Sequence, residues 1–177
     1  MKKITPKERV MQTAKQLFQK QGFNSTGINQ IIKESAVAKA SFYDHFPSKN
    51  QLAIAYLNQR HVTWFEGLEN FVKKAKNSTE KIIQAFEYLK FMNEKEDFSG
   101  CVFLNMMAEL KSENAEAHQI IKNHKTDLQN FFKQLAENEQ KAFLIYMLFE
   151  SCLMESQVYR NQEIINKTIE VLKANIL

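Results

Sequence analysis

Residues 22–49 read GFNSTGINQIIKESAVAKASFYDHFPSK, and this stretch decides the fold. It contains two short segments with helical spacing of apolar residues, one around Ile28–Ile32 and one near Ala38–Asp44. Ser35-Ala36-Val37 separates the two segments, and Pro47 prevents the second helix from continuing. Two short helices around a tight turn, set in basic sequence, are typical of a helix-turn-helix motif.

A longer helix is predicted directly before this motif. Thr5 can cap its start, Pro6 suits its first position, and Glu8 completes a capping box. Gly22 is well placed to end it in the left-handed conformation, and Ser25 or Thr26 can cap the next helix. The residues predicted to be buried in the three helices are Val10, Met11, Ala14, Leu17, Phe18, Ile28, Ile31, Ile32 and Phe42.

The rest of the chain predicts six longer helices, which makes nine in total and an all-α fold. Ser48 caps the first of these, and Asn77-Ser78-Thr79-Glu80 and Ser99-Gly100 mark restarts. The predicted ranges include 49–75, 101–110, 113–137, 140–158 and 161–175. We expect residues 1–48 to form a DNA-binding domain of three helices, and residues 49–177 to form a larger helical domain.

Composition limits the class of protein. The chain is 44% hydrophobic and has only four Gly and two Pro, which suits long helices with short turns. Residues 1–60 carry a net charge of +7 and the remainder −3, so either the N-terminal end meets a polyanion or it is an ordinary solvated surface. No secretory signal or membrane span is apparent, and the two cysteines lack metal-ligand spacing. The sequence therefore predicts a cytoplasmic protein without metal or cofactor.

Three blocks in and around the helix-turn-helix motif resemble the N-terminal signature of the TetR/AcrR family of bacterial regulators. They are Gly22-Phe23, residues 26–31, and residues 41–49 followed by Leu52. The resemblance covers about residues 7–56. It implies a transcriptional repressor, not an enzyme, that binds a palindromic operator as a dimer and is released by a small-molecule effector. It places these residues at or near the DNA: Thr26, Gly27, Lys39, Ala40, Ser41, Tyr43, His45 and Lys49.

Within that set, the resemblance implies that Tyr43, His45 and Lys49 mostly hold phosphates, whereas Lys39, Ala40 and Ser41 lie nearest the base edges. The chain departs from the family pattern at the turn, where Ala36 and Ala38 replace the usual glycine and serine. A left-handed Ala36 costs roughly 1–2 kcal/mol. The missing cap at Ala38 costs about 1 kcal/mol.

A weaker resemblance to one branch of the family lies in Gly100-Cys101 with Asn105 and Glu109, and it supports only the placement of a helix. Cys101 is either a sensor of oxidants or electrophiles or an inert buried thiol. Cys152 leaves the same question open.

The aromatic and methionine residues of the second domain recur at helical spacing. This pattern predicts either an effector pocket or an ordinary hydrophobic core, because such residues are found in both. An apolar or aromatic effector would suit a pocket of this composition. Its candidate residues are Trp64, Phe65, Phe86, Phe103, Met106, Met107, Phe131, Tyr146, Phe149 and Glu150. His124, on an apolar stripe, is expected to be a satisfied buried polar group.

The last two helices, near 140–158 and 161–175, are too apolar to face water on all sides, so we expect them to form a homodimer or to close the monomer's own core. The competing interpretation of the whole chain is a helical ligand-binding or interaction protein whose DNA-binding block is inactive. The sequence contains no recognisable catalytic constellation that would favour an enzyme.

Overall fold

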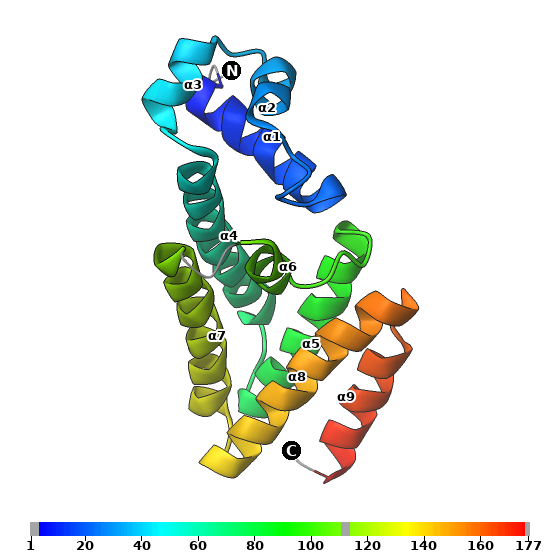
Figure 1. The fold of residues 1–177 in the computed structure, drawn as a ribbon. Coiled ribbons are helices and arrows are strands. Elements are labelled where there is room, and N and C mark those ends of the chain that lie inside the picture. Colours follow the sequence, from blue (N-terminus) through cyan, green and yellow to red (C-terminus); the bar gives the residue numbers. More distant parts are fainter. Residues whose placement is uncertain (1–3, 111–113, 176–177) are drawn as a thin grey trace. The chain divides into compact units, whose positions relative to one another are not determined.

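The structure is a computed structural model that describes residues 4–110 and 114–175. Within those residues the regular structure is entirely α-helical, which confirms the predicted fold class (Figure 1). The helices are α1 (Pro6–Gln21), α2 (Ile28–Ser35), α3 (Lys39–His45), α4 (Lys49–Val72), α5 (Ser78–Lys95), α6 (Val102–Glu109), α7 (Ala115–Leu135), α8 (Glu139–Tyr159) and α9 (Glu163–Asn175).

The chain forms two compact units. The first contains residues 1–61 and 102–122, and the second contains residues 62–101 and 123–177. Helix α6 and the first part of α7 therefore pack with the N-terminal helices, although they come much later in the sequence. The boundary expected at residue 48, between the DNA-binding domain and the larger helical domain, stays a prediction. The compact units are defined by contacts, and a functional domain can end at a different residue.

Helix α1 begins as predicted. The Thr5 hydroxyl accepts a hydrogen bond from the Glu8 N–H at 3.2 Å, and the Glu8 carboxylate accepts one from the Thr5 N–H at 2.7 Å. The predicted stripe from Val10 to Phe18 is buried. Gly22 ends the helix with φ 85° and ψ 166°, which is a positive φ but not the left-handed helical conformation that was expected. Only glycine adopts this backbone geometry readily.

The start of α2 corrects the predicted cap. Gly27 occupies the N-cap position, and no side chain caps the helix. The Thr26 hydroxyl instead donates to the Gly22 carbonyl oxygen at 2.6 Å, which ties together the turn between α1 and α2. Ile31 is fully buried, whereas Ile28 and Ile32 are only half-buried.

The second unit has its own core. Phe86, Phe132 and Phe149 pack together with ring centroids 5.3 to 6.4 Å apart. Asn77 caps α5 and Asn138 caps α8 through their side-chain oxygens. Helices α8 and α9 lie side by side at the C-terminal end (Figure 1). Buried residues from α5, α7, α8 and α9 all contribute to this core.

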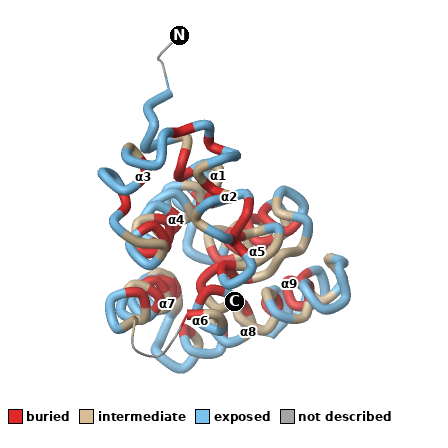
Figure 2. Tube along the Cα trace, turned by 45° about the horizontal axis from the view of Figure 1, so that its top comes forward, coloured by how far each residue is buried: buried red, intermediate tan, exposed pale blue. Residues whose placement is uncertain are grey.

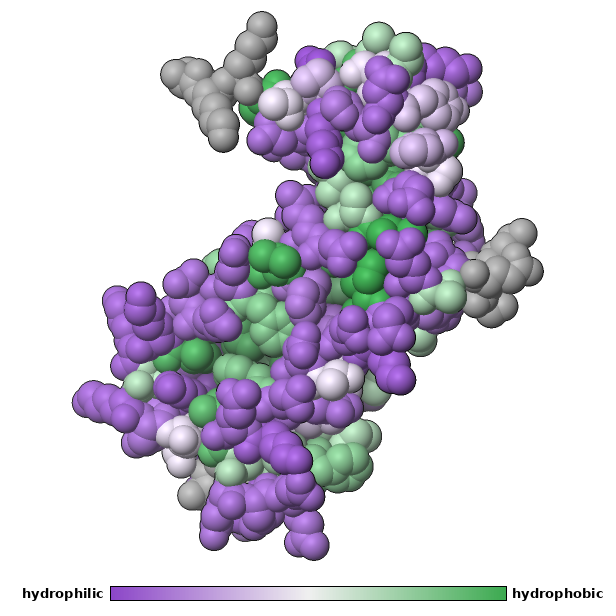
Figure 3. Space-filling model, turned by 90° about the vertical axis from the view of Figure 1, so that its left-hand side faces the viewer, coloured by the Kyte–Doolittle hydropathy of each residue, from purple (hydrophilic) through white to green (hydrophobic). Residues whose placement is uncertain are grey.

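Among the described residues, no helix is both long enough and apolar enough to cross a membrane. Hydrophilic side chains dominate the face of the molecule drawn in Figure 3, and apolar ones show there in smaller patches.

Candidate nucleic-acid interface

The turn between α2 and α3 is closed by backbone geometry alone. Ala36 has φ 51° and ψ 46°, as expected for a left-handed residue at this point. Its N–H points back to the carbonyl oxygens of Ile32 and Lys33. Ala38 is the N-cap of α3 and provides no side-chain hydrogen bond, so the missing cap is also confirmed. The motif therefore keeps its shape despite two unfavourable residues.

Helix α3 is oriented by one aromatic anchor. Phe42 is fully buried and contacts the rings of Tyr43 and Phe46, at 5.3 and 6.1 Å between centroids. Away from Phe42, much of α3 is exposed (Figure 2). Lys39 and Ala40 are exposed, and Tyr43 is 40% exposed. A short helix with small and polar residues outward has the shape that the major groove accepts.

The other predicted contact residues on α3 differ in accessibility. Ser41 is half-buried, and His45 is exposed, with its ring 6.4 Å from that of Phe46. His45 is the last residue of the helix. Both side chains remain available for DNA contact.

The N-terminal end of α2 is partly open. Gly27 is exposed, and a Cβ at this position would meet no atom within 4 Å. The free N–H groups at the start of a helix attract phosphate. The Thr26 side chain, by contrast, is fully buried, and its hydroxyl already donates to the Gly22 carbonyl oxygen. The placement of Thr26 at or near the DNA stays a prediction.

The Lys49 side chain already has contacts within the N-terminal helices. Its Nζ lies 4.1 Å from the centroid of the Phe23 ring and 3.4 Å from the Asn24 carbonyl oxygen. Burial lowers the pKa of Lys49, and the Glu109 carboxylate partly opposes that shift. The side chain is thus partly ordered before any DNA arrives.

Glu109 is a residue whose role the sequence did not reveal. Its carboxylate accepts a hydrogen bond from the Asn24 N–H at 2.6 Å. A Cβ on Gly22 would lie 2.7 Å from the same carboxylate, so any other residue would displace Glu109 from Asn24, and the positive φ of Gly22 also favours glycine. Helix α6 therefore holds the turn between α1 and α2. In the sequence, only the weak family motif that begins at Gly100 pointed to Glu109.

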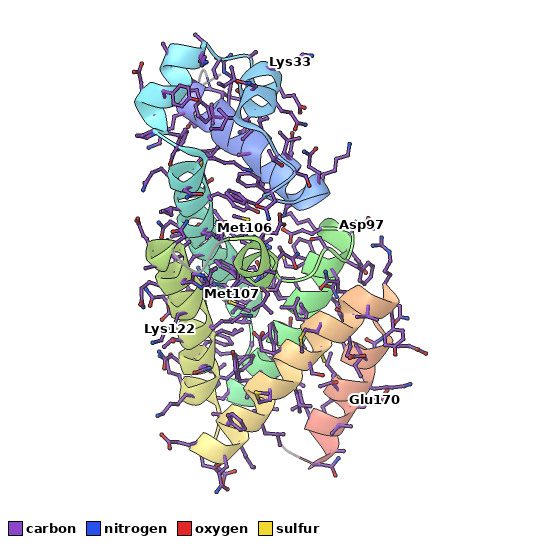
Figure 4. All side chains as sticks on the ribbon, in the orientation of Figure 1. Lys33, Asp97, Met106, Met107, Lys122 and Glu170 are labelled. Carbon is purple, nitrogen blue, oxygen red and sulfur yellow. The ribbon has the colours of Figure 1, made fainter. Side chains whose placement is uncertain are left out.

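The structure divides the candidate effector residues between the two units. Phe103, Met106 and Met107 belong to α6 in the first unit, where Met106 is buried and Met107 is 40% exposed (Figure 4). The other candidates belong to the second unit: Trp64, Phe65, Phe86, Phe131, Tyr146, Phe149 and Glu150. Phe86 and Phe149 are core residues.

Tyr146 alone among these candidates lines a cleft of about 180 Å³ between α7 and α8, together with Gln129, Lys133, Glu139, Ala142 and Phe143. His124 is buried and packs edge-on against the rings of Trp64 and Phe65, at 5.2 and 5.3 Å. This arrangement is that of a buried core histidine.

The buried Phe42, the closed turn and the exposed side of α3 define a helix-turn-helix protein. Residues 10–56 match the family described as bacterial regulatory proteins, tetR family. This part of the chain, which contains α2, α3 and most of α1, is a DNA-binding segment of the TetR type. The family is one of regulatory proteins, and this match agrees with the prediction that the chain is not an enzyme.

Comparison with individual proteins supports the same placement. The HTH-type transcriptional regulator LmrA of Bacillus subtilis is 52% identical over 54 residues, which are 30% of this chain and 29% of LmrA. The HTH-type transcriptional repressor NemR of Escherichia coli is 26% identical over 107 residues, 59% of this chain and 53% of NemR. These alignments thus span less than two thirds of either relative.

The likeness of fold extends further than the likeness of sequence. The crystal structure of a TetR transcriptional regulator from Legionella pneumophila superposes with a TM-score of 0.83 at 20% identity, and the alignment covers 100% of both chains. The fold of the whole chain is therefore that of a TetR-type regulator.

Proposed function

We propose that this chain is a DNA-binding transcriptional repressor that occupies a palindromic operator as a homodimer and leaves it when a small apolar or aromatic effector binds. The observation that carries the proposal is the orientation of α3, in which Phe42 is buried and Lys39, Ala40 and Tyr43 are exposed. Residues 10–56, which match the tetR family of bacterial regulatory proteins, include this helix.

The residues on this surface fall into two proposed roles. Tyr43, His45 and Lys49 hold phosphates, as do the N–H groups at Gly27, and these contacts position the protein on the duplex. Lys39, Ala40 and Ser41 face the base edges in the major groove and discriminate among sequences.

A second copy of the chain is the proposed partner of α8 and α9. Ala142, Ile145, Phe149 and Cys152 bury one side of α8. The opposite side carries an apolar stripe that is unusually exposed for its residue types: Phe143 66%, Met147 47%, Met154 52% and Val158 70%. Spacings of four and seven residues place these side chains in one row. Exposed apolar rows of this kind mark protein interfaces.

A two-fold symmetric operator whose half-sites lie about 34–36 Å apart requires two copies of α3. One α3 contacts too few base pairs to select a site alone. The dimer is therefore part of the DNA-binding proposal.

The effector is proposed to bind in the second unit. Trp64, Phe65, Phe131 and Tyr146 are only partly buried, so their rings have apolar surface to offer. Binding there would favour a state of the dimer with lower DNA affinity. We also propose a cytoplasmic location, where the DNA is and where Cys101 and Cys152 would stay reduced.

Fluorescence anisotropy tests the DNA-binding proposal. A labelled pool of 30-base-pair duplexes of random sequence is titrated with the protein at rising salt concentration. We expect binding at low salt that weakens steeply as salt rises, because bound Lys and Arg release counterions from the phosphates. Lack of salt-sensitive binding at low ionic strength would favour the alternative, a ligand-binding or interaction protein with an inactive DNA-binding block.

A further inference from the structure

The backbone of Asn24, in the turn between α1 and α2, is held by two side chains of opposite charge. Its N–H donates to a Glu109 carboxylate oxygen at 2.6 Å, and its carbonyl oxygen accepts from the Lys49 Nζ at 3.4 Å. Glu109 is the last residue of α6, and Lys49 is the first residue of α4. All three residues belong to the first unit. One residue of the turn therefore connects a carboxylate and an ammonium group from two different helices.

Other backbone groups of this turn find their partners close by in the sequence. The Gly22 N–H donates to the Phe18 carbonyl oxygen at 3.1 Å, and the Thr26 N–H donates to the Phe23 carbonyl oxygen at 3.2 Å. The Asn24 N–H differs, because its acceptor is the carboxylate on α6. A hydrogen bond to an ionised acceptor is stronger than one between neutral groups. Helix α6 thus makes a strong contact with the turn at this point.

The Lys49 ammonium rests on the segment that Glu109 holds. Its Nζ lies 4.1 Å from the centroid of the Phe23 ring, beside the Asn24 carbonyl oxygen. Phe23 is 6% exposed, and its ring packs against that of Phe18 with centroids 5.5 Å apart. The face of an aromatic ring carries partial negative charge and attracts an ammonium group. The ring and the carbonyl oxygen together define where the ammonium lies before DNA binds.

The charge of Glu109 also favours the ionised form of Lys49. Burial lowers the pKa of Lys49, and the Glu109 carboxylate opposes this shift. The first position of α4 is itself unfavourable for a cation, since the start of a helix carries partial positive charge. A nearby carboxylate offsets both effects. The ionised form is the one that forms a charge-assisted hydrogen bond with a phosphate.

A carboxylate near a phosphate-binding lysine has two opposite effects on DNA affinity. Its charge repels the phosphates, whereas its hydrogen bond to Asn24 orders the support of Lys49 in advance. Glu109 is half-buried, and one of its oxygens is directed to the Asn24 N–H. Salt screens repulsion across solvent, but it weakens a short, partly buried hydrogen bond much less. At physiological salt the ordering effect is therefore expected to be the larger of the two.

We infer that Glu109 is a positioning residue for DNA binding, which fixes the Phe23-Asn24 segment under the Lys49 ammonium and so strengthens the contact between Lys49 and a DNA phosphate. This inference rests on the proposed DNA-binding function. It concerns overall affinity and not sequence preference, because phosphate contacts carry no direct sequence information.

A double-mutant cycle with the native full chain tests the inference. Fluorescence anisotropy with a pool of random duplexes gives the affinity of the wild type, Glu109→Ala, Lys49→Ala and the double variant. We expect Glu109→Ala to weaken binding about tenfold and to reduce the salt slope toward that of Lys49→Ala. In the Lys49→Ala background, the same substitution should change the affinity by less than about twofold, because the residue through which it acts is gone. Equal losses in both backgrounds would overturn the inference.

Two further variants separate positioning from charge. Glu109→Gln keeps an oxygen that can accept from the Asn24 N–H, so it should bind DNA more tightly than Glu109→Ala. Glu116→Ala is the matched control, because it removes the same charge from an exposed position near the start of α7 in the same unit. This control should not weaken DNA binding. Tighter binding than wild type in both Glu109 variants would mean that repulsion dominates, and the inference would be wrong.

The cycle also separates this inference from the proposed function on which it rests. A wild-type chain without salt-sensitive DNA binding would contradict both. A wild-type chain that binds DNA normally, together with additive effects of the two substitutions, would contradict only the role of Glu109. Circular dichroism of each variant checks that the helices are retained, so that a loss of affinity is not a loss of fold.

Discussion

Helices α3 and α8 handle their apolar residues in opposite ways. On α3 the apolar anchor Phe42 is buried, and the exposed residues are mostly small or polar, with Tyr43 partly exposed beside them. On α8 apolar residues cover both sides, from the buried Phe149 to the exposed Phe143 and Val158. The first surface suits a polyanion and the second suits another apolar protein surface. We therefore propose a different partner for each helix: DNA for α3 and a second copy of the chain for α8.

Removing the anchor of α3 should have the largest effect. Phe42→Ala deletes a fully buried ring, and we expect it to lower the free energy of unfolding of the N-terminal helices by about 3–5 kcal/mol. Urea denaturation followed by circular dichroism measures this change. The matched control is Tyr43→Ala, which removes a 40% exposed ring from the neighbouring position and should cost far less. Similar losses for both variants would contradict the inward anchor.

Charging the exposed row on α8 should separate the dimer without unfolding the chain. Met147→Glu/Met154→Glu should give a monomer in sedimentation velocity and lower DNA affinity on the order of 100-fold, because two linked half-site contacts are lost. Val62→Glu, at a 50% exposed apolar residue on α4, is the control and should stay dimeric. A dimer that survives the double substitution would show that α8 does not form the interface.

The two proposed kinds of DNA contact should respond differently to substitution. Lys39→Ala should cost about 1–3 kcal/mol on the preferred sequence and change the order of preference, as expected for a base contact. Lys49→Ala should weaken all sequences about equally and reduce the salt slope by about one. Anisotropy titrations on a panel of duplexes distinguish them. If Lys49→Ala changed the preference instead, its assignment to a phosphate would be wrong.

The smallest effect concerns the turn that joins the two helices of the motif. Ala36 has φ 51°, a conformation that glycine adopts without the steric penalty of a Cβ. Ala36→Gly should therefore stabilise the chain by about 1 kcal/mol. The midpoint of urea denaturation measures it, with Ala40→Gly on α3 as a control that should destabilise. A loss of stability in Ala36→Gly would contradict the strained geometry.

The sequence predicted the helices well because periodicity and caps are local properties. The capping box at Thr5 and Glu8 was readable from neighbouring residues, and the left-handed Ala36 followed from the glycine that the family usually has at that position. Contacts between residues that are distant in sequence could not be predicted in this way. The Glu109 carboxylate on Asn24 and the Lys125 amine beside Cys101 join residues 85 and 24 positions apart, and no local pattern indicates them. The assignment of the effector candidates to two different units was likewise not readable from a local pattern, and the effector pocket stays a prediction.

Selection from random DNA tests the central claim most directly. The protein is mixed with a pool of duplexes of random sequence, and bound duplexes are recovered, amplified and sequenced over several rounds. We expect an enriched two-fold symmetric site with half-sites about one helical turn apart, and loss of the enrichment in Met147→Glu/Met154→Glu. A pool that stays random after selection would contradict the account.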